Sequence, residues 1–173
     1  AMAGIGTYSK IEGFEFLPIT SFMMALTTFV SQNRGAKEYE RARKGAHFGL
    51  VCSISLAETI GLLIALFVTP LMRLFVDDPQ VIQYGVERAH YATILFFMLA
   101  YSHGVSAVLR GVGKSIIPMV VMLVCWCLVR VTLLTMLNML FHNILFVYLI
   151  YPFTWSLSSI VFFLYYRKIN WQE

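Results

Sequence analysis

Five long apolar windows follow one another along the chain, and each is bounded by charged or turn-forming residues. They cover residues 4–31, 46–76, 82–109, 116–140 and 143–166, with ends uncertain by about two to four residues. A helix needs about 20 mostly apolar residues to cross the hydrocarbon core of a bilayer, so every window is long enough. Barrel strands would alternate apolar and polar positions, whereas residues 62–67 are apolar throughout. The pattern predicts an all-α membrane protein, a bundle of five transmembrane helices.

The composition agrees with a chain that faces lipid. Of its 173 residues 59% are hydrophobic and 13% are charged, and the mean hydropathy is +0.74, whereas a soluble domain is about half apolar and a quarter charged. A soluble enzyme, a disordered tail and a disulfide-stapled secreted module are excluded. The net charge of +4 does not indicate nucleic acid as a partner, because the positive residues lie in short loops. The three cysteines show no disulfide or zinc spacing, and we expect neither a metal nor a cofactor.

The charges between the windows predict the orientation, since Lys and Arg in short loops mark the cytoplasmic side. Residues 32–44, 110–114 and 167–168 are basic, whereas residues 76–80 are acidic and residues 138–143 are uncharged. This alternation predicts a multi-pass protein of the plasma membrane with a cytoplasmic C-terminus. The first window then begins outside the cell, and no signal peptide precedes it. We therefore expect the C-terminal piece of a longer membrane protein, with at least one further helix upstream.

Two carboxylates in the first window are the leading candidates for a functional site. Counted inward from Gly4, Glu12 lies about 12 Å deep and Glu15 about 17 Å deep, near the bilayer midplane. An unpaired carboxylate at that depth is costly and usually faces a water-filled cavity or a partner. Glu12 and Glu15 share a helix face, an arrangement suited to exchanging a proton or a sodium ion for an organic cation. Alternatively, each carboxylate pairs with a nearby Lys or Arg and fixes helix packing.

Lys10, Glu58 and Arg130 are further charged residues inside the windows that could have a structural or coupling role. Lys10 is close enough to the surface for its ammonium group to reach the interface, so we expect a structural role. Glu58 and Arg130 have opposite signs and lie near the middle of the second and fourth windows. A bridge from Arg130 to Glu58 or to Glu12 would reduce the cost of burying both charges. Sequence alone leaves both pairings open, and a helix-locking role for Arg130 is favoured over contact with substrate.

Two other residues bear on mechanism. Pro18, in the middle of the first window, frees a backbone carbonyl and permits a bend. His103 has no second histidine or carboxylate at ligand spacing on its helix, so a metal role is not expected. Aromatic side chains that face a cavity beside a carboxylate would suit a flat, lipophilic cation.

Several short motifs carry a resemblance that spans nearly the whole chain. KIEGFEFLP at 10–18, followed by QNRGA at 32–36 and ERA at 40–42, resembles the second helix and following loop of the C-terminal lobe in the multidrug and toxic compound extrusion family. LRGVG at 109–113 and WCLVR at 126–130 fit the same lobe in the same order.

The resemblance implies a protein of twelve helices in two six-helix lobes, to which this chain contributes the last five helices of the second lobe. The N-terminal lobe of the same polypeptide would be its partner. The resemblance further implies a secondary antiporter that exports small, cationic, lipophilic drugs in exchange for sodium ions or protons. Sodium-linked relatives carry an acidic residue on the helix that is third here, yet residues 97–102 contain none. Glu12 or Glu15 would take over that role, or protons are handled elsewhere.

Other classes of protein stay open. A lipid-linked oligosaccharide flippase of the same superfamily would line its cavity with Arg and Lys, whereas the mid-membrane charges here lean acidic. A non-transporting membrane assembly subunit would also fit the hydropathy. A membrane enzyme would need a polar constellation near one interface, such as His and Asp pairs at metal spacing, and no such pair is evident in the sequence. We therefore expect no enzymatic activity.

Overall fold

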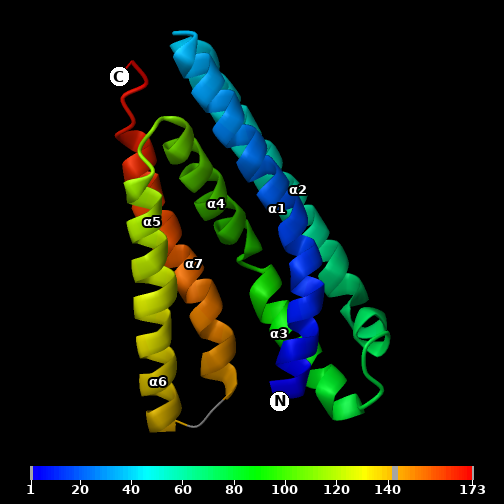
Figure 1. The fold of residues 1–173 in the computed structure, drawn as a ribbon. Coiled ribbons are helices and arrows are strands. Elements are labelled where there is room, and N and C mark those ends of the chain that lie inside the picture. Colours follow the sequence, from blue (N-terminus) through cyan, green and yellow to red (C-terminus); the bar gives the residue numbers. More distant parts are fainter. Residues whose placement is uncertain (1, 142–143, 173) are drawn as a thin grey trace.

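The computed structural model describes residues 2–141 and 144–172, and Figure 1 shows this part as a bundle of helices. The helical elements are α1 (Met2–Gly35), α2 (Tyr39–Arg73), α3 (Pro79–Thr93), α4 (Phe96–Gly111), α5 (Ile116–Met122), the π-helix η1 (Leu123–Val129), α6 (Arg130–Phe141) and α7 (Ile144–Arg167). Four helical stretches in the described residues are long and apolar enough to span a membrane, and the bent α3–α4 pair makes a fifth. The prediction of an all-α membrane protein is confirmed.

The predicted windows and the observed helices differ mainly at their ends. The basic loop predicted at 32–44 is mostly helical, because α1 continues to Gly35 and α2 begins at Tyr39. Lys37 closes the turn between them with a φ of 61°, in the left-handed region. The N–H of the next residue, Glu38, donates to the Asn33 carbonyl at 2.8 Å. This hydrogen bond caps the C-terminal end of α1. The predicted start of the last window, Asn143, lies outside the described residues.

The third window is a broken span rather than one straight helix. Helices α3 and α4 meet at an angle of 57°. At the end of α3 the Thr93 hydroxyl donates to the Ala89 carbonyl at 2.9 Å, and such back-bonding bends helices. The Leu95 N–H then bonds to the Ala92 carbonyl at 3.2 Å, which is the tighter three-residue spacing that ends an α-helix. The break exposes free backbone groups in the middle of the span.

The fourth window is helical throughout, but its central seven residues, Leu123–Val129, form the π-helix η1. Such insertions are rare and frequently occur at functional sites. Here the π-helix ends immediately before Arg130. In contrast, α1 remains helical through Pro18.

Small residues allow α1 to approach its neighbours closely. A Cβ atom on Gly4 would lie 2.4 Å from the Val81 carbonyl oxygen of α3, and one on Gly111 would lie 3.0 Å from the Thr27 carbonyl oxygen of α1. Figure 1 shows α1 beside α2 on one side of the bundle and α5–α6 beside α7 on the other. Helix α4 lies between them and contacts α1, α2 and α7.

The three basic segments lie at one end of the bundle. Figure 1 places the α1–α2 turn, the α4–α5 turn and the C-terminal tail together, with the N-terminus and the α2–α3 loop at the opposite end. The Arg34 guanidinium donates to the Val112 carbonyl and joins the first two of these segments. The buried apolar residues form two clusters, one that includes Leu50 and Phe162 and another that includes Phe96.

Candidate functional site

An ion pair between α1 and α3 forms the centre of the charged cluster. The Arg88 Nη2 atom donates to Glu12 Oε2 at 2.9 Å, and 7% of the Arg88 side chain and 20% of the Glu12 side chain are exposed. Glu12 thus has a partner that sequence reasoning missed. The signal was present, because a charged residue inside an apolar window is itself a candidate for a buried pair.

Arg130 binds a hydroxyl group rather than a carboxylate. Its Nε and Nη2 atoms donate to Thr154 Oγ1 of α7 at 3.1 and 2.6 Å. Its guanidinium lies over the rings of Trp126 and Tyr151, 5.2 and 4.6 Å from their centroids. The ion pairs found among residues 2–141 and 144–172 do not include Arg130, so neither predicted pairing, with Glu12 or with Glu58, is observed. Arg130 instead joins α6 to α7.

The Tyr151 ring lies against two guanidinium groups. Arg88 is 4.7 Å and Arg130 4.6 Å from its centroid, and Arg88 also lies 5.7 Å from the centroid of Tyr8. The electron-rich face of an aromatic ring attracts cations, so Tyr151 reduces the cost of placing two positive charges close together. Through these contacts α1, α3, α6 and α7 converge on one point within the bundle.

Glu15 has a different environment from Glu12, although both lie on α1. Glu15 is 1% exposed, and Tyr8, two turns before it, is fully buried. The Tyr8 hydroxyl and the Glu15 carboxyl face each other, but Glu15 Oε1 and the Tyr8 hydroxyl have no well-formed hydrogen bond among the described residues. Glu12 is therefore ion-paired and partly exposed, whereas Glu15 is buried and forms no ion pair within the part of the chain that the structure describes.

The two remaining predicted charges lie apart from Arg130. Glu58 of α2 is near the backbone N–H of Phe97, in the first turn of α4, where a negative charge interacts favourably with the helix dipole. Glu58 also lies close enough to Glu15 for their charges to interact. Glu58 thus lies beside the break in the third span. Lys10 is exposed, and its ammonium group lies 5.9 Å from the centroid of Phe75.

A polar contact network lies beside the charged cluster. His103 of α4 is 7% exposed and packs edge-to-face against Phe16 and Trp126, with centroid distances of 4.9 and 5.1 Å. The Trp126 indole N–H donates to Ser158 of α7 at 3.2 Å, and Ser158 shares a hydrogen bond of 2.9 Å with Ser102 of α4. The described part of the chain contains no group of three His, Cys, Asp or Glu side chains arranged to hold a metal ion.

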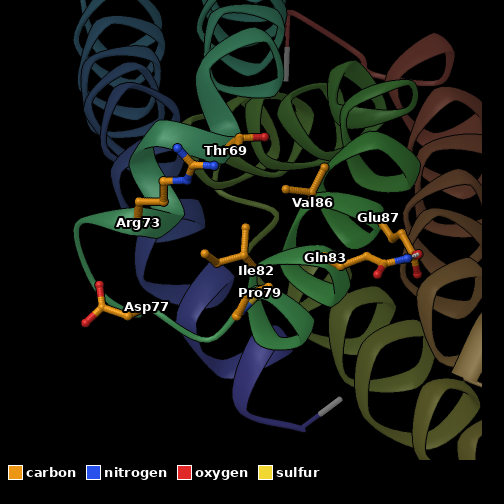
Figure 2. A pocket seen from close by; sticks show the side chains of 8 residues that line it. All are labelled: Thr69, Arg73, Asp77, Pro79, Ile82, Gln83, Val86 and Glu87. Carbon is orange, nitrogen blue, oxygen red and sulfur yellow. Dashed lines mark hydrogen bonds between the residues drawn. The ribbon is translucent and has the colours of Figure 1, made fainter.

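A separate pocket of about 590 Å³ opens at the end of the bundle that holds the α2–α3 loop (Figure 2). Arg73 and Asp77 contribute charges to it from the end of α2 and the loop, and Gln83 donates to Glu87 at 3.0 Å on the facing side of α3. Glu87 is next to Arg88 in sequence, so one turn of α3 contributes to both this pocket and the charged cluster.

The MatE family model matches residues 1–136 of the chain. The chain is 30% identical over 121 residues to the probable multidrug resistance protein NorM of Thermotoga maritima, which covers 70% of this chain and 26% of the relative. It is 23% identical over 175 residues to the probable multidrug resistance protein YoeA of Bacillus subtilis, which covers 100% of this chain and 37% of the relative.

An FAD transporter of Shewanella oneidensis is 27% identical over 84 residues, covering 49% of this chain and 19% of the relative. The chain thus spans between 19% and 37% of the length of these three relatives. Because the family match covers most of the sequence and agrees with the all-helical membrane fold, the chain belongs to the MatE family, the multidrug and toxic compound extrusion family that its motifs resemble.

Proposed function

We propose that this chain forms part of a secondary active antiporter that exports lipophilic organic cations in exchange for protons or sodium ions. In this proposal the chain supplies the last five helices of the second lobe, and the N-terminal lobe of the same polypeptide faces it across the substrate path. The protein lies in the plasma membrane, with the basic loops and the C-terminus in the cytoplasm and the start of α1 outside. The names of two relatives, both probable multidrug resistance proteins, support the substrate class.

The observation that carries the proposal is the buried carboxyl group of Glu15, which has no cationic partner among the described residues. A carboxyl group in apolar surroundings is stable only as the neutral acid or with a bound cation. Glu15 therefore suits a site that the coupling ion and the organic cation occupy in turn. Glu12 is less suited to that role because Arg88 already neutralises it.

The charge balance of the cluster explains how exchange would work. With a coupling ion on Glu15, the remaining charges of Glu12, Glu58, Arg88 and Arg130 sum to zero. Without that ion, Glu15 is negative and the five side chains together carry minus one. An organic cation is more stable beside the negative cluster than beside the neutral one, since opposite charges attract strongly where water is scarce. Binding of the coupling ion thus favours release of the organic cation.

Efflux measurements test this proposal. Cells that express the protein are loaded with ethidium, a flat organic cation, and its loss is followed by fluorescence. Glu15→Gln keeps the shape of the side chain but cannot ionise, so we expect efflux to fall to that of cells without the protein. Glu38→Gln, at an exposed position in the α1–α2 turn, is the matched control and should leave efflux unchanged. Normal efflux from the Glu15→Gln protein would refute the proposal.

One observation favours a second candidate, the export of compounds that carry an anionic group. Arg130 has no carboxylate partner among the described residues, and its Nη1 atom makes no hydrogen bond there. Its guanidinium is stacked on two aromatic rings, a suitable place for an aromatic anion. One relative is named an FAD transporter. Selective loss of carboxyfluorescein efflux in Arg130→Gln, with ethidium efflux retained, would support this candidate, whereas loss of ethidium efflux alone would exclude it.

A further inference from the structure

A groove lies between the first turns of α2 and the end of α7, at the end of the bundle that holds the basic segments. Its volume is about 520 Å³. One wall consists of α2 side chains and the other of Tyr166 and Trp171, from the last turn of α7 and the tail. The α2 side chains that line the groove are Arg43, Lys44, His47, Phe48 and Val51. We refer to it as the α2–tail groove.

The α2 wall changes from charged to apolar along the helix. Arg43, His47 and Val51 are spaced four residues apart, so they lie above one another on one helix face. At 1.5 Å per residue they cover about 12 Å. The charged side chains are nearest the end of the bundle, whereas Phe48 and Val51, 72% and 50% exposed, lie further along the span. The change from charged to apolar side chains along this wall matches the change from headgroups to acyl chains in a bilayer.

The opposite wall consists of aromatic side chains that favour the same depth. Tyr166 and Trp171 pack edge-to-face with their centroids 6.4 Å apart. The tail turns back onto the bundle, since Ile169 is 9% exposed and belongs to the adjacent apolar cluster. Amphipathic Trp and Tyr rings prefer the headgroup region of a membrane. The residues of both walls are thus suited to the headgroup region of the bilayer.

The groove has an excess of positive charge. Arg43 and Lys44 are exposed cations, and of these Lys44 forms an ion pair with Glu40 at 2.7 Å, whereas the described residues offer Arg43 no carboxylate within ion-pair distance. Arg43 lies close enough to Tyr166 and to Glu40 for electrostatic interaction with both, without forming an ion pair. Among the described residues, those that line the groove include no acidic side chain. A ligand that complements it carries a negative charge at one end and an apolar chain at the other.

We propose that the α2–tail groove binds an anionic phospholipid of the cytoplasmic leaflet. Its phosphate is placed between Arg43 and Lys44, and one acyl chain follows Phe48 and Val51. Basic pockets between transmembrane helices at the cytoplasmic side are known to suit such headgroups. The bound lipid bridges α2 and α7, which lie on opposite sides of the bundle (Figure 1). This site is separate from the charged cluster in the middle of the membrane, so its test does not depend on the transport proposal.

Trp171 supplies the optical signal for a test. The protein is reconstituted in nanodiscs of unlabelled phosphatidylcholine that contain a small fraction of phosphatidylglycerol with a nitroxide near the glycerol end of one acyl chain. Parallel samples contain phosphatidylcholine with the same label. The contribution of Trp171 to quenching is the difference between the unmodified protein and Trp171→Phe. We expect labelled phosphatidylglycerol to quench Trp171 at a much lower mole fraction than labelled phosphatidylcholine.

Substitutions then identify the residues that select the lipid. Each Lys or Arg near an anionic lipid changes its affinity about five-fold, so Arg43→Gln should raise the half-quenching fraction of phosphatidylglycerol about five-fold and leave that of phosphatidylcholine unchanged. Arg41→Gln is the matched control, because Arg41 is exposed on the same helix but does not line this groove. Equal quenching by the two lipids, or an unchanged preference in Arg43→Gln, would overturn the proposal. So would full displacement of the lipid by glycerol phosphate, which would indicate a site for the phosphate alone.

Discussion

The Glu12–Arg88 ion pair is the contact whose loss can be predicted most closely, because it joins two helices that are distant in sequence. Arg88→Gln leaves the Glu12 carboxylate without a cation, and Glu12→Gln leaves Arg88 without an anion. Arg88 is 7% exposed and Glu12 20%, so neither group is adequately hydrated once its partner is removed. Both single substitutions should therefore destabilise the contact between α1 and α3.

The size of the effect follows from these exposures. Breaking a fully buried pair costs about 3–5 kcal/mol. Because a fifth of the Glu12 side chain reaches the surface, we expect a smaller loss for Arg88→Gln, about 2–3 kcal/mol. Glu12→Gln should cost a similar amount, since Arg88 is more buried but keeps its contacts with Tyr8 and Tyr151. The double variant contains no unpaired charge, so it should recover about 1–2 kcal/mol relative to the sum of the single losses.

The assay is a double-mutant cycle on the protein in mixed micelles. Unfolding by a denaturing detergent is followed by circular dichroism for the unmodified protein, the two single variants and the double variant. The free energies of unfolding yield the coupling energy directly. Single losses that sum to the loss in the double variant within about 0.5 kcal/mol would show that the two side chains do not interact, and the reasoning about the cluster would then be refuted.

Three further substitutions test the packing around the site. Gly4→Ala places a Cβ atom 2.4 Å from a backbone oxygen of α3 and should lower the midpoint of thermal unfolding. Gly6→Ala is the control, because nothing lies within 4 Å of its Cβ position. Equal midpoints for the two variants would contradict the close approach of α1 and α3. Thr154→Val removes the acceptor of both Arg130 hydrogen bonds. It should lower the free energy of unfolding by about 1–3 kcal/mol in the same detergent titration, whereas Thr154→Ser keeps the hydroxyl and should retain most of the stability. Asp78→Ala removes the N-cap of α3, whose carboxylate accepts from the backbone N–H of Gln80 at 2.9 Å, and should cost about 1 kcal/mol. Unchanged hydrogen exchange at the start of α3 would exclude this role.

Hydropathy predicted most of the fold because lipid imposes a length on every spanning helix. The first, second, fourth and fifth windows correspond to helical spans in the structure. The break in the third window was not predicted, because the back-bonding of the Thr93 hydroxyl leaves no signal in hydropathy. The carboxylate beside the break, Glu58, comes from a different helix. The π-helix Leu123–Val129 was also missed, because its wider turn produces no recognisable pattern in a segment that is apolar at every position.

For the candidate site, the depth of a residue along its helix was not enough to predict its environment. Glu12 and Glu15 were both placed near the midplane, and the three-residue spacing was taken as one shared face. Three residues correspond to about 300° of rotation, so the two side chains point in directions about 60° apart. This difference is enough for Glu12 to pair with Arg88 while Glu15 is buried. The partner of Glu12 lies 76 residues away in sequence, so only the packing of α1 against α3 identifies it.

The central claim, that Glu15 is the group on which coupling ion and organic cation compete, can be measured by chemical labelling. A hydrophobic carbodiimide reacts with protonated carboxyl groups inside the membrane, and mass spectrometry of the digested protein locates the adduct. The account predicts labelling of Glu15 in preference to Glu12, with protection of Glu15 when ethidium is present. Labelling of Glu12 instead, or labelling of Glu15 that ethidium does not reduce, would contradict it.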